Sequence, residues 1–167
     1  MNKYDTGIAR FFANIFDTTL FIPVAFLDRF ILTEEKPLSL VIIWILISNC
    51  LLIAYNLYFH TKNGQTLGKR LMGIVVLDVT EQRYLTLKQA FLRDSIYILF
   101  QTGTVFLIII RLFSIGNYSE SSISTYNLYL SYFSLIWLFV EIITMLTNKK
   151  RRAFHDFLGT SVVVKLR

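Results

Sequence analysis

The chain has 167 residues, of which 54% are hydrophobic and 17% are charged, and its formal net charge is +6. Soluble proteins average roughly 45–50% apolar and about 25% charged residues. The charges also cluster, and the long uncharged segments between them are more than a soluble domain of this size can bury. Composition therefore excludes an ordinary soluble domain and predicts a single membrane domain over residues 1–167.

Four apolar segments are each close to the roughly 20 residues that cross the hydrocarbon core of a bilayer. We expect spans at about 11–31, 38–59, 97–113 and 126–146. The first has no signal-peptide cleavage site and contains Pro23, which can kink a helix. The third lies between Asp94 and Arg111, so we expect it to be short or partly irregular.

Basic residues indicate how the spans are oriented. They concentrate before the first span, in the loop 60–96 and in the tail 147–167, which leaves only Arg29, Lys36 and Arg111 for the other two loops. The positive-inside rule then predicts a multi-pass protein of the inner or plasma membrane with both termini and the central loop in the cytoplasm. Orientation and anionic lipid account for the net charge, so the lipid bilayer is the expected partner and nucleic acid is not.

Two short Val-rich segments, 73–79 and 162–164, lie in the predicted cytoplasmic parts. Each alone would leave its backbone unpaired, so we expect them to form a small sheet together. Residues 86–94 have a mostly apolar face and predict an interfacial helix that bends into the third span. The expected fold is an all-α membrane protein, a four-transmembrane-helix bundle with a small cytoplasmic two-stranded β element and an interfacial helix.

Two acids, Asp17 and Glu141, lie well inside the predicted spans. Asp17 shares a helical face with Arg10 and lies about 10 Å deeper, and Glu141 lies near the end of the fourth span. A carboxylate that faces lipid costs about 2.5 kcal/mol or more, so these side chains must face protein or water. For Asp17, an ion pair or hydrogen bond that orients the bundle and a titratable proton or cation site are both open.

Four polar side chains are expected at a similar depth if the helices form a bundle. These are Asp17, Glu141, Gln101 and Asn56, and they could line one polar cavity that is open to the cytoplasm. Two neighbouring carboxylates would raise one pKa, as a proton-coupled site requires. Asn56 fits interhelical hydrogen bonding as well.

Other chemistries are disfavoured by spacing. The segment from Gly64 to Arg70 superficially resembles a phosphate-binding loop, but it is one residue short and Arg70 replaces the required Ser or Thr. His155 and Asp156 have no nucleophile beside them and too few companions for a metal, so a capping or docking role fits better. We therefore expect no enzyme activity, no cofactor and no metal site.

Several motifs occur in an order that resembles the RDD family of bacterial membrane proteins. They are Ala9-Arg10-x-x-Ala13-x-x-x-Asp17, then Gly64-Gln65-Thr66-x-Gly68-Lys69-Arg70-x-x-Gly73-x-x-Val76, then Arg93, and then Arg152, His155, Asp156 and Thr160. The family is named for one arginine and two aspartates. Arg10 and Asp17 match the first two, and Asp156 matches the second aspartate better than Asp94 does.

The resemblance implies two functional hypotheses, because a role in ligand transport has been suggested for the family and other members act as partners or inhibitors of membrane-bound proteins. In the first, Asp17, with Glu141, binds a proton, Na⁺ or K⁺ while Arg10 tunes the site. Four spans are few for a transporter, so this hypothesis also predicts a homodimer. In the second, Arg10, Asp17 and Asp156 clamp the tail and central loop onto the bundle and present a docking surface to a membrane-protein partner.

Overall fold

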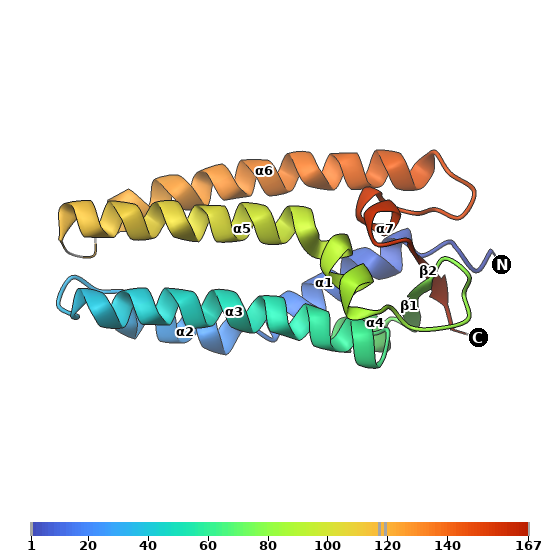
Figure 1. Cartoon of the computed structure of the whole chain (residues 1–167), viewed down its shortest axis with the longest axis horizontal. Coiled ribbons are helices and arrows are strands. Elements are labelled where there is room, and N and C mark those ends of the chain that lie inside the picture. Colours follow the sequence, from blue (N-terminus) through green and yellow to red (C-terminus); the bar gives the residue numbers. More distant parts are fainter. Residues whose placement is uncertain (1, 117, 119, 167) are drawn as a thin grey trace.

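A computed structural model describes residues 2–116, 118 and 120–166, with the side chains of 120–123 left aside. Four helical segments are long and apolar enough to cross a membrane, Gly7–Ile31, Leu38–Lys62, Leu87–Ile115 and Ser124–Leu146. They run along one common axis, and both chain termini lie at the same end of the bundle (Figure 1). The chain is a multi-pass membrane protein, and the predicted fold class is confirmed.

The first span consists of two helices. α1 (Gly7–Thr19) ends just before α2 (Ile22–Ile31), and Pro23 lies in the first turn of α2. Proline is well tolerated there because the first-turn N–H groups have no partner inside the helix. The predicted kink is thus a short break at Leu20 and Phe21.

The other spans are unbroken helices, α3 (Leu38–Lys62), α5 (Leu87–Ile115) and α6 (Glu120–Leu146). The expected short or irregular third span is wrong, because α5 is continuous from Leu87, where Thr86 and Gln89 form a capping box. Figure 1 shows its first turns inclined to the rest of the helix, as the predicted bend requires. Asp94 does not end this helix, because its side chain lies beside His60 of α3 rather than in lipid.

The two Val-rich segments form the predicted two-stranded sheet, and its strands are antiparallel. β1 (Ile74–Asp78) pairs with β2 (Ser161–Lys165), with Val76 opposite Val163. Side chains alternate between the two faces, so Val76 and Val163 pack toward Ala13 of α1, whereas the next residues in each strand pack near Tyr4. We call the end of the bundle that carries this sheet and both termini the sheet end.

Two five-residue helices at the sheet end were not predicted, α4 (Leu67–Leu71) and α7 (Phe154–Leu158). α4 packs against α1, and α7 packs against α5 and α6. Helices of this length are too short to produce a hydrophobic period that can be recognised in a sequence. They matter because they bring the motif residues of the central loop and the tail onto the membrane helices.

Candidate functional site

Asp156 is the centre of a buried ion cluster at the sheet end. Its side chain is fully buried, and Oδ2 accepts a hydrogen bond of 2.6 Å from Arg10, which lies 146 residues earlier in the sequence. Oδ1 accepts from Nε of Arg93 at 3.2 Å and from Ser161 at 3.0 Å. The N–H of Ala153 donates to Oδ2, which caps α7. One carboxylate therefore fastens the tail to both α1 and α5.

His155 lies between Arg93 and Glu141. Its Nδ1 is 2.5 Å from Oε2 of Glu141, and its Nε2 is 2.8 Å from a guanidinium nitrogen of Arg93. Arg93 can only donate, so Nε2 carries no proton in this arrangement and the ring proton lies on Nδ1, which faces Glu141. The backbone N–H of His155 donates to Oε1 of Glu141 at 3.3 Å. If the ring carried a second proton, Nε2 could no longer accept from Arg93. It would instead donate to Oδ1 of Asp156, which lies 3.4 Å away.

Charges in this cluster shift the pKa values of both tail residues. Burial lowers the pKa of His155, but Asp156 and Glu141 outweigh it and raise that pKa above its usual value. Burial would raise the pKa of Asp156, yet Arg10, His155 and Arg93 hold it well below its usual value. Asp156 is therefore a permanent anion at neutral pH, and His155 is a titratable group.

His60 and Lys69 extend the cluster toward the central loop. Nε2 of His60 lies 3.2 Å from Nζ of Lys69 and 3.1 Å from Arg93, so it acts as an acceptor. Its Nδ1 faces Asp94 at 3.5 Å. Lys69 is only 7% exposed, and burial, reinforced by the charge of Arg93, lowers the pKa of Lys69 to about 8. This amine can thus change its charge close to physiological pH.

Asp17 is held by the central loop and not by Arg10. Its carboxylate accepts hydrogen bonds from the Tyr55 hydroxyl at 2.7 Å, the Thr66 hydroxyl at 2.5 Å and the N–H of Gly68 at 2.7 Å. Of the two interpretations of Asp17, hydrogen bonding that orients the bundle describes these contacts. Arg10, on the same helical face, pairs instead with Asp156 of the tail.

Several residues of the motif that begins at Gly64 have structural roles. A Cβ on Gly68 would lie 2.1 Å from the carbonyl oxygen of Ala13, so only glycine lets α4 approach α1 this closely. Gln65 donates to the carbonyl of Ile74, which ties the loop to β1. Gly73 has a φ of +63° and turns the chain from α4 into the strand.

Asp17 and Glu141 are joined only indirectly. From Asp17 a series of contacts passes through Thr66 to Lys69, with 3.4 Å between the Thr66 hydroxyl and Nζ, and then to His60, Arg93, His155 and Glu141. We call the charged or titratable members the charged network: Arg10, Asp17, His60, Lys69, Arg93, Asp94, Glu141, His155 and Asp156. It is built from α1, α3, α4, α5, α6 and α7.

Gln101 and Asn56, the other two residues of the predicted cavity, make none of these contacts. Within the described part of the chain, the buried Oε1 of Gln101 has no hydrogen-bond partner. Asn56 is partly buried on α3. The hydrogen bonds of Asp17 and Glu141 go to different partners, so a single cavity that is shared by all four residues stays a prediction.

The family model described as RDD matches residues 6–160. The chain belongs to the RDD family. No match was found among curated proteins or among solved structures. In this RDD protein Arg10 forms an ion pair with Asp156, and Asp94 lies beside His60.

Sequence analysis missed His60, Tyr55 and Ser161, each of which contacts a motif residue. For His60 a signal was available, because Asn49, Asn56 and His60 follow one another at i, i+7 and i+11 on one helical face. For Tyr55 and Ser161 there was none, since a tyrosine within an apolar helix and a serine at the start of a strand are both ordinary.

Proposed function

We propose that this RDD protein exchanges protons for monovalent cations, Na⁺ or K⁺, and that the charged network binds the exchanged ions. The observation that carries the proposal is that four acidic side chains and only two arginines lie in one connected, largely buried cluster. The cluster reaches from Asp17 of α1 to Glu141 of α6 and includes Asp94 of α5. Ionisable groups at this depth are costly to keep and commonly mark ion pathways.

The charge count supports cation uptake. The network holds four carboxylates and two arginines, which are Asp17, Asp94, Glu141, Asp156, Arg10 and Arg93. If its bases were all neutral, two negative charges would be unbalanced, and unbalanced charge in a buried site is expensive. Protons on Lys69 and His155 supply the balance near neutral pH, since the pKa of Lys69 is about 8 and that of His155 is raised.

Competition between protons and Na⁺ or K⁺ follows from the same charge count. As the pH rises through 8, Lys69 loses its proton and the network becomes more negative. A Na⁺ or K⁺ ion that binds to the carboxylates would restore neutrality, and a returning proton would expel it. Proton-driven exchange needs this mutual exclusion. We further propose a homodimer, because four spans offer little room for a complete pathway.

The test is a flux measurement on the pure protein in proteoliposomes that contain a pH-sensitive dye. We expect added Na⁺ or K⁺ to dissipate an imposed pH gradient, and Glu141→Gln and Asp17→Asn to reduce this flux at least tenfold. Asp5→Asn removes an exposed acid outside the network and serves as the matched control. Absence of cation-dependent proton movement, or unchanged flux in both network variants, would refute the proposal.

A second function, docking onto a partner membrane protein, is favoured by a different observation. Asp156 and Asp17 hold the tail and the central loop against the bundle, as the clamp hypothesis requires. A non-catalytic interaction role would leave the pure protein without flux. In that case Asp156→Ala should abolish binding to the partner while Glu141→Gln, which leaves the Arg10–Asp156 pair in place, should preserve it.

A further inference from the structure

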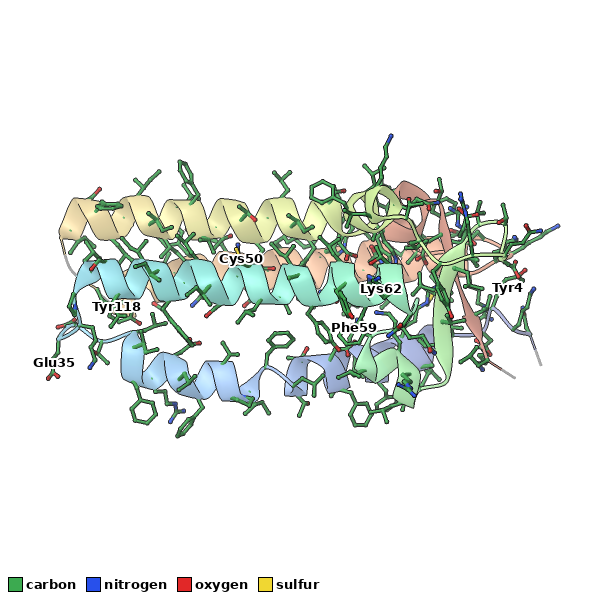
Figure 2. The ribbon with its side chains drawn as sticks, turned by 60° about the horizontal axis from the view of Figure 1, so that its bottom comes forward. Tyr4, Glu35, Cys50, Phe59, Lys62 and Tyr118 are labelled. Carbon is green, nitrogen blue, oxygen red and sulfur yellow. The ribbon has the colours of Figure 1, made fainter. Side chains whose placement is uncertain are left out.

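A cavity of about 330 Å³ opens at the sheet end, separate from the charged network. It is lined by Phe59 and Lys62 at the end of α3, by Arg70 of α4 and by Tyr84 of the loop between β1 and α5. Figure 2 shows Phe59 and Lys62 at the sheet end of α3. The volume is in the range of roughly 300–1,000 Å³ that is typical of small-ligand pockets.

The charge of this cavity is positive. Lys62 and Arg70 are both exposed, and none of the described residues that line the cavity is acidic. Among the described residues neither cation has an ion-pair partner, in contrast to Arg10 and Arg93. Two uncompensated cations in one concave site attract an anion, and a guanidinium group is well suited to bind phosphate oxygens.

The rest of the cavity is partly apolar and lies near the membrane surface. Phe59, Leu67 and Tyr84 contribute apolar or aromatic walls, and the last two are 40% and 48% exposed. Lys62 is the final residue of a membrane span, so the cavity lies at the level where the hydrocarbon core gives way to headgroups. A ligand with an anionic head and an apolar body fits both features.

The shape of the cavity depends on a glycine. Gly64 has a φ of +63°, and a Cβ there would lie 2.7 Å from the ring of Tyr84 and 2.6 Å from the carbonyl oxygen of Val76. Glycine therefore lets Tyr84 and β1 approach the loop after α3, and this approach forms one wall. The glycine that begins the family motif is therefore required by this close approach.

We propose that this cavity binds the phosphate of an anionic phospholipid headgroup. Lys62 and Arg70 hold the phosphate, and Phe59 and Leu67 contact the glycerol and first methylene groups. Basic pockets at the ends of membrane helices are known to suit such headgroups. The site is independent of the proposed ion exchange, since none of its residues belongs to the charged network.

The experiment is a titration of the full-length protein in detergent with short-chain phosphatidylglycerol, followed by native mass spectrometry. Short-chain phosphatidylcholine and inorganic phosphate are titrated in parallel. The test variant is Lys62→Gln with Arg70→Gln. The matched control is Lys88→Gln with Lys149→Gln, which removes two exposed cations outside the cavity.

We expect the protein to bind one phosphatidylglycerol in preference to phosphatidylcholine. The test variant should lose roughly thirty-fold in affinity, since each cation near an anionic surface contributes about a factor of five. The control variant should bind as the unaltered protein does. Equal binding of both lipids, or equal losses in the two variants, would overturn the proposal. If inorganic phosphate binds as tightly as the lipid, the ligand is free phosphate and the lipid assignment is overturned.

Discussion

The carboxylate of Asp156 offers the sharpest test of how this protein is held together. Asp156→Asn keeps the size of the side chain and removes its charge. Arg10 and Arg93, whose side chains are 12% and 4% exposed, would then be left with positive charges and no anion between them. Breaking a buried ion pair on one side costs about 3–5 kcal/mol. We expect the free energy of unfolding to fall by that amount.

The control is the same substitution at an exposed pair. Asp5 contacts Arg151 at 2.7 Å, but their side chains are 55% and 38% exposed. Exposed pairs contribute about 0–1 kcal/mol, so Asp5→Asn should change stability by less than that. The assay is equilibrium unfolding in mixed micelles, read by circular dichroism. Equal effects of Asp156→Asn and Asp5→Asn would refute the idea that this ion cluster stabilises the sheet end.

Acid unfolding gives a second readout of the same group. Asp156 has a pKa well below its usual value in the folded chain. Its contribution is therefore complete above the unfolded pKa of about 3.9 and is lost as the pH falls through the lower folded value. Asp156→Asn should therefore reduce the loss of unfolding free energy at low pH. A double-mutant cycle with Arg10→Met should give a coupling energy well above that of exposed pairs.

Three further predictions concern the loop, the buried lysine and the orientation. Gly68→Ala should destabilise the protein by about 1–3 kcal/mol in unfolding assays because its Cβ would strike the Ala13 carbonyl, whereas Gly103→Ala, with open space around it, should be neutral or stabilising. The pKa of Lys69 is about 8 when folded, so stability should rise between pH 8 and about 10.5 by up to about 3 kcal/mol, and Lys69→Met should abolish that rise. Fluorescent and phosphatase reporters fused to either terminus should both report the cytoplasm; a periplasmic signal from either would contradict the predicted orientation.

The sequence by itself determined the features that depend on local composition. Long apolar segments specify spans wherever they occur, because a bilayer demands about 20 apolar residues regardless of their neighbours. The alternating valines near Val76 and Val163 specified the paired strands, since an unpaired strand leaves its backbone unsatisfied. The acids at Asp17 and Glu141 were recognised as partnered because lipid cannot solvate them.

Only the tertiary structure decided which charged side chains pair with one another. Arg10 and Asp17 share a helical face, yet Arg10 pairs with Asp156, while Asp17 binds the loop through Gly68. These partners are remote in sequence, and short helices that carry no recognisable period bring them together. The side chain of Asp94 lies beside His60 and away from lipid, so a charge that was expected to interrupt the third span lies within a continuous helix. Contacts of this kind depend on how the helices pack, and no local pattern records them.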